Sequence, residues 1–453
     1  MGSKQIKITG SSLPDRISDL PSNIIESILD RIPIREAVAT SVLSKGWRHR
    51  WRRIPSLVFD DDFVGYFWNV QKQRGFGEAR IKLEYSNVIG KILLIHLGPI
   101  HKFVLHIPDL WSSFPLDLSS WMLFISQNKV VKELTIEDLD DWIVRLPSYV
   151  FQCDELQHLK LHFQEFYLHP PHDFRGFCNL LSLDLSGFLD GDEISNLVSK
   201  CPLLERLSLN CMACSHPLVI DAPRLLFLHV YFMLNAFPKL KSVCSLTAIS
   251  LLFQSPGTLS FCDLFDFFGS VPKVETVTLL TLHPMTVMPM PQDAPTSFHT
   301  TLHNHKSLTL LELNISSPQC MYFVLCILKS SPNLQKLNLY LENSPETIED
   351  EAASHLLDMQ TREPHTLNSL LTIKIKWLSG SKVEIMFIKM ILSCSPVLKT
   401  MYLTGTYSSG LGKDILNEAE FTLMSELLQC TRSSYRAQVN YSRYPGDSSI
   451  FDF

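Results

Sequence analysis

The 453-residue chain contains no run of 18 or more apolar residues free of charged or strongly polar positions, so the sequence predicts no transmembrane helix and no membrane partner. The first twelve residues, MGSKQIKITGSS, hold no apolar stretch typical of secretory signals, and Ile6 stands where an N-myristoylation pattern requires Ser or Thr. Cysteine is absent before Cys153, and the eleven cysteines do not form a secreted disulfide framework. We therefore expect a protein of a reducing compartment.

An excess of positive charge is also lacking, because 46 Asp and Glu residues outnumber 40 Lys and Arg residues and leave a net charge of −6. A general binder of nucleic acid or acidic membrane needs a broad excess of Lys and Arg. Basic residues gather only at 45–53, where a DNA-reading helix or a nuclear signal is the alternative, but Trp47 and Trp51 in this run indicate a structural role. We expect no nucleic-acid partner, and a location in the nucleus and/or cytoplasm.

The sequence has no complete catalytic or metal-binding motif. Residues 211–214 with His216 have the spacing of half a zinc site, but no second close Cys/His pair follows. Residues 405–413 imitate a phosphate-binding loop, yet Leu411 stands where the lysine is required. The acidic run 60–62 is more typical of a solvated connector than of a cation site. We predict no metal, no cofactor and no catalytic residue, which makes an enzyme the least favoured class.

The most informative stretch is residues 13–57, which hold two closely spaced apolar helical faces and a tryptophan pair. Pro21 follows Leu20 at a position where a missing N–H costs little, so a helix is predicted to start there and to end at Pro33. The apolar residues that share one face of this helix are Ile24, Ile25, Ile28, Leu29 and Ile32. Such a short segment buries little of its own surface, so we expect other surfaces to complete these faces.

Two more helical patterns follow. The second runs from Ile34 to Leu43 and places Val38 and Val42 one turn apart, and the third sets Trp47 and Trp51 at i and i+4. The alternative is three helices that pack only on their own domain.

This stretch resembles the F-box motif in its plant form, through Leu20-Pro21, Ile28-Leu29, Ile32-Pro33, Val42-Leu43-Ser44 and Trp47-Arg48 with Trp51. The resemblance implies binding to a Skp1-like adaptor and, through it, to the cullin and RING subunits of a ubiquitin ligase. The implied Skp1-binding residues are Leu20, Pro21, Ile24, Ile25, Ile28, Leu29, Ile32, Pro33, Val38, Val42, Leu43, Trp47 and Trp51.

From Val131 onward the unit L-x-x-L-x-L occurs eleven times, and successive copies begin 21 to 36 residues apart. The shorter intervals match leucine-rich repeats, in which a short strand and a helical or irregular return form one coil of a solenoid with parallel strands. The copies begin at Val131, Leu156, Leu180, Leu204, Leu225, Leu246, Val274, Leu308, Leu334, Leu370 and Leu398.

The central x of each unit must lie on the face opposite the leucines, which predicts a row of side chains on a concave surface. This row contains Thr135, Lys160, Asp184, Ser208, His229, Ser250, Thr278, Glu312, Asn338, Lys374 and Tyr402. Its mixed polar character favours an unknown target protein as the partner, and the alternative is a row that is merely solvated. The predicted target-binding members are Lys160, Asp184, His229, Glu312, Asn338, Lys374 and Tyr402.

Residues 370–403, with Gly380 and Glu384 among the matching positions, resemble the core of the FBD domain that follows the repeats in many plant F-box proteins. Two other stretches, 283–295 and 342–351, are rich in proline or acidic residues and predict loops that either grip a substrate or are simple surface excursions.

Together these patterns predict an α/β fold with a flexible N-terminus (1–12), a three-helix F-box (13–60), an irregular leucine-rich-repeat solenoid with parallel strands (61–359), a closing FBD-like region (360–440) and a tail (441–453). We expect a non-catalytic substrate-recognition adaptor, of which small-molecule sensing would be a subtype. The alternative is a repeat scaffold that acts outside any ubiquitin ligase.

Overall fold

The computed structural model describes Ile17 and residues 20–107, 117–128, 130–138, 143–188, 190–211, 218–232, 237–253, 261–271, 273–280, 301–342, 366–405, 423–427 and 429–443. The chain divides into two compact units. Unit 1 contains Met1–Trp142 and Leu146–Gln164, and unit 2 contains Ile143–Arg145 and Glu165–Phe453. Except for Glu342, the two predicted loops lie outside the described residues, as do residues 212–216 and 406–413 of the zinc-like and phosphate-loop-like motifs.

Unit 1 begins with short helical segments, the first two of which follow a proline. They are α1 (Ser22–Leu29), α2 (Ile34–Ala39) and the 3-10 turns η1 (Thr40–Val42) and η2 (Arg50–Arg53). The continuous third helix predicted through Trp47 and Trp51 was wrong, because backbone bonds there span three residues, as from Arg50 N–H to the Trp47 carbonyl at 3.2 Å. Gly46 and the run of like charges both disfavour a longer α-helix.

A parallel sheet completes unit 1, with strand order β1 (Ser56–Phe59), β2 (Lys102–Ile107), β3 (Glu133–Asp138) and β5 (His158–Tyr167, which ends in unit 2). The other elements of unit 1 are α3 (Asp61–Gln73), α4 (Glu78–Ile95), α5 (Leu118–Gln127) and η3 (Ser148–Gln152). Leu57 pairs with Phe103, and Phe103 with Leu134, so two repeats precede the first predicted one. They escaped the spacing analysis because α3 and α4 separate their strands.

Aromatic packing joins α3 and α4 to this sheet. Phe59 and Phe63 meet edge to face at 5.1 Å, and the buried Tyr85 donates a hydrogen bond of 2.9 Å to the His106 carbonyl. The acidic run 60–62 belongs to the start of α3, where Asp60 Oδ1 accepts from Phe63 N–H at 3.0 Å. Helix capping therefore accounts for this carboxylate.

Unit 2 is a longer parallel ladder. Its main strands, in sheet order, are β6 (Ser182–Phe188), β7 (Arg206–Cys211), β9 (Phe227–Phe232), β11 (Ala248–Phe253), β12 (Thr276–Leu280), β13 (Ser307–Leu313), β14 (Lys336–Leu341), β15 (Thr372–Leu378), β16 (Thr400–Gly405) and β17 (Gln438–Arg443). The short strands β8 (Val219–Asp221) and β10 (Lys239–Lys241) form a second parallel pair, and β4 (Ile143–Arg145) pairs with the end of β5.

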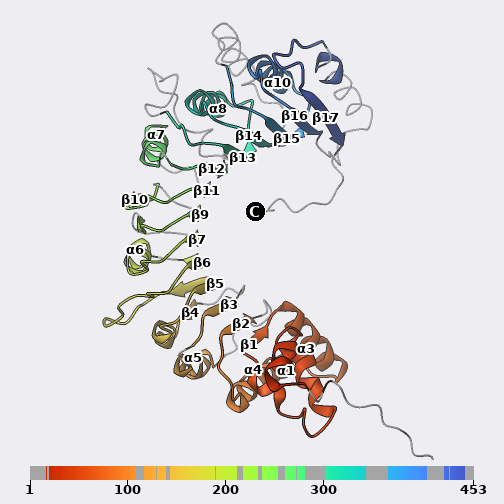
Figure 1. Ribbon diagram of the computed structural model, residues 1–453, viewed down its shortest axis with the longest axis vertical. Coiled ribbons are helices and arrows are strands. Elements are labelled where there is room, and N and C mark those ends of the chain that lie inside the picture. The colour runs from red at the N-terminus through yellow and green to blue at the C-terminus, as the bar shows by residue number, and fades with distance from the viewer. Residues whose placement is uncertain are drawn as a thin grey trace, which may run out of the picture. The chain divides into compact units, whose positions relative to one another are not determined.

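Helices of unit 2 lie on one side of its ladder, as Figure 1 shows. They include α6 (Gly191–Ser199), α7 (Phe261–Ser270), α8 (Pro318–Ser330) and α10 (Lys382–Cys394). The repeat leucines point toward them and are buried, and Leu183, Leu207 and Leu337 are each 0% exposed. Alternate residues of each strand therefore form an open face that no helix of this set covers.

One repeat has a different register from the predicted one. Leu308 of β13 pairs with Val277 and Leu337, so Thr309 lies in the central row and the assignment of Glu312 to this row was wrong. The run SLTLLEL offers leucines in two registers, and the first leucine position is occupied by His305, which is 1% exposed. A bulge between Leu310 and Leu313 contains Glu312, whose φ is 51°.

The FBD-like region continues the stack. Ser381 and Glu384 form a reciprocal capping box at the start of α10, and Glu384 also accepts from the Ser379 and Gly380 amides at 3.2 and 2.7 Å. Burial raises the pKa of the Glu384 carboxyl, and these amide donors oppose the rise. Gly380 has a φ of 84°, a conformation that glycine adopts without strain. Strand β17 then adds one more ladder position, which the repeat pattern did not predict.

Candidate docking surfaces

The helical segments of unit 1 carry exposed apolar side chains on α1 and at the end of η1. Ile24 and Ile28 are 42% and 44% exposed, Val42 is 85% exposed and Leu43 is 66% exposed. We call Ile24, Ile28, Val42 and Leu43 the apolar edge. Apolar side chains so accessible on one short segment are typical of a surface that another protein covers.

The other residues predicted to bind the Skp1-like adaptor differ in how far they are buried. Ile25, Leu29, Trp47 and Trp51 are at most 7% exposed and belong to the core of unit 1. Leu20, Ile32 and Val38 are half-buried, and Pro21 and Pro33 are exposed. Helical geometry explains the division in α1, because Ile25 and Leu29 lie one turn apart on the inner side while Ile24 and Ile28 lie one turn apart beside them.

Backbone contacts hold η2 against the end of α4. Arg52 Nε donates to the Ile95 carbonyl at 2.5 Å, and Leu97 N–H donates to the Arg52 carbonyl at 2.8 Å. Gly98 leaves no room for a side chain, since an added Cβ would lie 2.7 Å from the Arg53 carbonyl oxygen. At the end of α1, Asp30 Oδ1 accepts from Ser56 N–H at 3.0 Å. The apolar edge is therefore carried by segments tied to the sheet and to α4.

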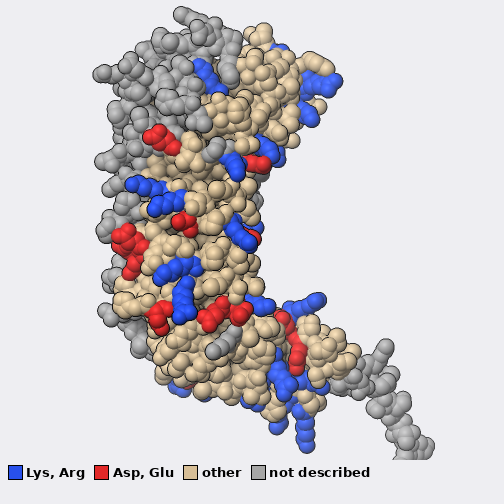
Figure 2. Space-filling model, turned by 60° about the vertical axis from the view of Figure 1, so that its left-hand side comes forward, with Lys and Arg blue, Asp and Glu red and all other residues tan. Residues whose placement is uncertain are grey.

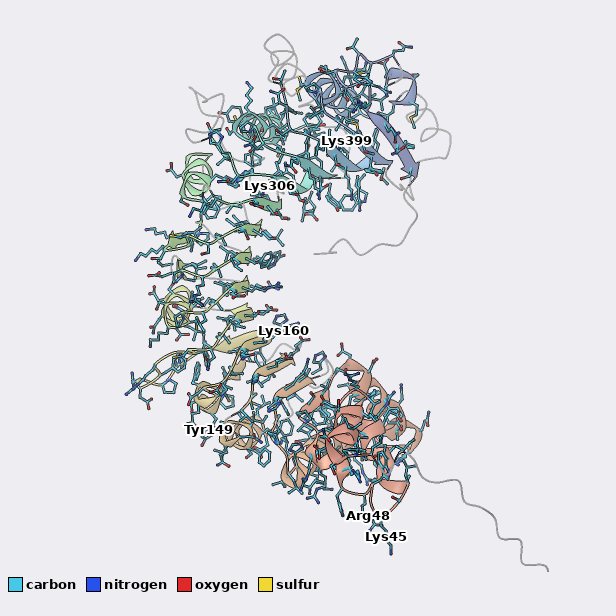
Figure 3. All side chains as sticks on the ribbon, in the orientation of Figure 1. Lys45, Arg48, Tyr149, Lys160, Lys306 and Lys399 are labelled. Carbon is cyan, nitrogen blue, oxygen red and sulfur yellow. The ribbon has the colours of Figure 1, made fainter. Side chains whose placement is uncertain are left out.

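The basic run beside the apolar edge faces outward. Figure 3 shows Lys45 and Arg48 at the outer margin of unit 1, pointing away from its body. Arg50 lies over the Trp47 ring at 5.8 Å and donates to the Gly46 carbonyl at 3.2 Å. Trp47 and Trp51 are buried, as their interpretation as structural residues requires.

The open face of the unit 1 sheet carries paired charges. Lys160 Nζ lies 2.6 Å from Glu137, whose other carboxylate oxygen lies 3.4 Å from His106 Nε2. His106 Nδ1 also lies 3.0 Å from Asp61. Figure 3 shows Lys160 on this open face and Tyr149 on the opposite side, among the helices.

The central row of unit 2 runs, by strand register, through Asp184, Ser208, His229, Ser250, Thr278, Thr309, Asn338, Lys374, Tyr402 and Asn440. Ser250 and Thr278 are buried, whereas Lys374 and Tyr402 are exposed. Burial lowers the pKa of His229, and the nearby Asp184 carboxylate opposes this effect. The most accessible predicted target-binding residues of this row therefore belong to the C-terminal strands.

A hollow of about 810 Å³ opens on β13–β17 and joins predicted residues to others that the pattern missed. Asn338, Lys374 and Tyr402 line it together with Lys336, Lys376 and Tyr441. Lys336 stands two positions before the central residue Asn338, Lys376 stands two positions after the central residue Lys374, and Tyr441 lies on the unpredicted strand β17. Because side chains two positions apart on a strand share one face, the sequence held a signal for the two lysines.

Neither sign of charge covers the face shown in Figure 2, where Lys and Arg side chains are interspersed with Asp and Glu. Within the part of the chain that the structure describes, no three His, Cys, Asp or Glu side chains gather as a metal site would require. Among the same residues, no helix is both long and apolar enough to cross a membrane.

Comparisons with known proteins match both parts of the chain. The F-box domain model matches residues 17–59, and the model described as FBD-associated F-box protein At5g56370, LRR repeats, matches residues 118–339. The chain is 34% identical over 443 residues to F-box/FBD/LRR-repeat protein At1g13570 of Arabidopsis thaliana, with 94% of this chain and 98% of that protein covered. It is 32% identical over 207 residues to F-box/LRR-repeat protein At4g14103 of Arabidopsis thaliana, and this match covers 43% of this chain and 49% of that protein.

Proposed function

Because the chain belongs to the F-box/FBD/LRR-repeat family, we propose that it is the substrate-recognition adaptor of an SCF-type E3 ubiquitin ligase. In this role the F-box binds a Skp1-like subunit, which connects it to the cullin and RING subunits, and the repeats hold a target protein. F-box/LRR proteins are generally non-catalytic adaptors. Tethering raises the effective concentration of the target near the charged ubiquitin carrier, so the chemistry belongs to other subunits.

The observation that carries this proposal is the apolar edge on α1 and η1. Full burial of a large aliphatic side chain contributes roughly 1.5 to 3 kcal/mol. Val42 is 85% exposed, so its burial in a complex would add most of this free energy to binding. Ile28 is 44% exposed, so its burial would add about half. A carboxylate at either position would be desolvated without a partner in the complex.

The test measures the affinity of the purified chain for a Skp1-like protein by calorimetry. The double variant Ile28→Asp/Val42→Asp is expected to bind at least about 100-fold more weakly, the equivalent of about 3 kcal/mol. Leu83→Asp is the matched control, because Leu83 is 48% exposed on α4, outside the apolar edge. Affinity unchanged in the double variant, with its fold intact by circular dichroism, would overturn the assignment.

Leu29→Asp is unsuitable for this purpose, since Leu29 is 1% exposed and its replacement would damage the core itself. The double variant has a second use in cells. It should trap targets without their destruction, so the half-life of a captured protein should lengthen when the variant replaces the wild-type chain. A partner whose half-life is the same with both chains would favour a scaffold outside the ligase.

A further inference from the structure

The hollow on β13–β17 differs from the rest of the open face in its charge. Lys336, Lys374 and Lys376 line it, with neutral polar residues and Tyr402 around them, and no carboxylate is among the described lining residues. We call the three lysines the lysine cluster. Figure 3 labels Lys306 and Lys399 at the starts of β13 and β16, two strands of the hollow.

Strand register brings the lysine cluster together. Lys374 and Lys376 alternate along β15 and therefore share its open face, with Cα atoms about 7 Å apart. Lys336 of β14 pairs with Thr372 of β15, and Lys374 follows Thr372 by two residues on the same face. Lys336 and Lys374 are therefore diagonal neighbours, with Cα atoms about 8 Å apart. These separations are no longer than a Debye length at physiological salt, so the three charges act on one another and on a common ligand.

Other lysines on the open faces have carboxylate partners. Lys102 lies 2.9 Å from Glu133, and Lys160 lies 2.6 Å from Glu137. At the turn before β13, Lys306 likewise lies 2.7 Å from Glu275. The lysine cluster has no carboxylate within 4.0 Å among the described residues. Two of its lysines lie over aromatic rings: Lys374 Nζ is 5.9 Å from the centroid of the Tyr402 ring, and Lys376 Nζ is 4.9 Å from the centroid of the Tyr340 ring. A ring contact positions the ammonium group and leaves N–H donors for a ligand.

A backbone irregularity lies beside the lysine cluster. The register of β15 shifts between Lys376 and Leu378, and Trp377 at this bulge has a φ of 65°, which is strained for a bulky residue. The Trp377 ring packs edge to face on Tyr340 at 5.5 Å, and Tyr340 is the ring that Lys376 faces. Bulges of this kind re-aim side chains next to binding sites.

We infer that the lysine cluster, together with Tyr402, binds an acidic segment of the target protein, one that carries several Asp or Glu carboxylates. This inference rests on the proposed function, because the segment belongs to the protein that the repeats would hold. The row from Asn338 to Asn440 crosses three strand spacings, about 14 Å, which an extended peptide of about five residues spans.

The chemistry of the hollow favours carboxylates over other anions. Lysine acts as a point charge, whereas bidentate recognition of phosphate favours arginine, which is absent from the described lining residues. Nucleic acid needs a basic surface far wider than three lysines, and the chain is acidic overall. Side-chain amides such as those of Asn338 and Asn440 suit the backbone of an extended peptide.

The test mixes the full chain, bound to its Skp1-like partner, with the fluorescent peptide Gly-Glu-Glu-Gly-Glu-Glu-Gly. Fluorescence anisotropy measures the binding of the peptide at about 50 mM salt, where charges are weakly screened. This peptide should bind roughly tenfold more tightly than the same peptide with Gln in place of each Glu. The variant Lys336→Gln/Lys374→Gln/Lys376→Gln should bind the two peptides with equal affinity. The matched control Lys91→Gln/Lys132→Gln/Lys382→Gln removes the same charge from exposed lysines outside the hollow and should keep the difference in affinity between the two peptides.

Each other outcome overturns the inference. Equal binding of the two peptides, or equal loss in the control variant, would remove the acidic segment as ligand. A phosphoserine peptide bound at least tenfold more tightly than the glutamate peptide would identify a phosphate site instead, and an RNA oligonucleotide bound more tightly would identify a nucleic-acid site. Affinity for the Skp1-like protein, measured on the same samples, separates these failures from failure of the proposed function.

Discussion

His305 offers a sharp test of the repeat register. It stands where other repeats have a leucine, and its backbone N–H donates to the Leu302 carbonyl, as the Leu334 N–H donates to the Ser331 carbonyl in the next repeat. Its ring packs at 6.0 Å from Phe268. Ser331 Oγ lies 3.4 Å from His305 Nδ1, while Nε2 has no partner among the described residues. Burial lowers the pKa of His305 from 6.5 to about 4.

The sign of the resulting pH dependence follows from proton binding. Between pH 4 and 6.5 the unfolded chain binds a proton at His305 that the folded chain does not, so the free energy of unfolding rises with pH across this window. Relative to pH 7.5, the loss attributable to His305 is about 2 kcal/mol at pH 5 and approaches about 3 kcal/mol near pH 4. The variant His305→Leu restores the repeat leucine and should remove this contribution.

Urea unfolding followed by circular dichroism at pH 5 and pH 7.5 measures the effect. The difference in unfolding free energy between the two pH values should be smaller by about 2 kcal/mol in His305→Leu than in the wild type. His303→Gln, two residues away and exposed, is the matched control and should keep the wild-type difference. An unchanged difference in His305→Leu would refute the buried neutral imidazole and the register that places it there.

Two further predictions concern close backbone contacts. Glu384→Ala should lower the free energy of unfolding by about 2 kcal/mol, measured by urea titration, because the amides of Ser379, Gly380 and Ser381 would lose their acceptor; stability equal to the wild type would contradict the capping box. Gly98→Ala should destabilise by about 1 to 3 kcal/mol through its clash with the Arg53 carbonyl, whereas Gly65→Ala in α3, with nothing within 4 Å of the new Cβ, should stabilise by about 0.5 to 1 kcal/mol. Similar melting shifts in the two alanine variants would contradict the close approach at Gly98.

The docking segment shows how far local pattern reaches. Pro21 predicted the start of α1, since proline restricts the backbone whatever packs around it, and the apolar pattern from Ile34 predicted the start of α2. The spacing of Trp47 and Trp51 predicted a helix that the fold replaces with 3-10 turns. Apolar identity alone did not separate Ile28, which is exposed, from Leu29, which is buried, because both lie near one helical face.

The repeats show the same limit in another form. Most strands follow the predicted leucines, as Leu337 pairing with Ile373 illustrates, because parallel coils bury equivalent positions. The register failed where SLTLLEL offered two choices, and strand pairing selected the one that buries His305. Strand β1 was missed because its next repeat follows two long helices.

The sequence by itself determined the family, the leucine ladder and the absence of a broad basic surface, since these depend on residue identity and spacing along one chain. Only the tertiary structure decided which apolar residues stay outside the core and which lysines from β14 and β15 share one hollow. The physical reason is that exposure and charge clustering depend on what packs beside each residue, and strands distant in sequence supply those neighbours.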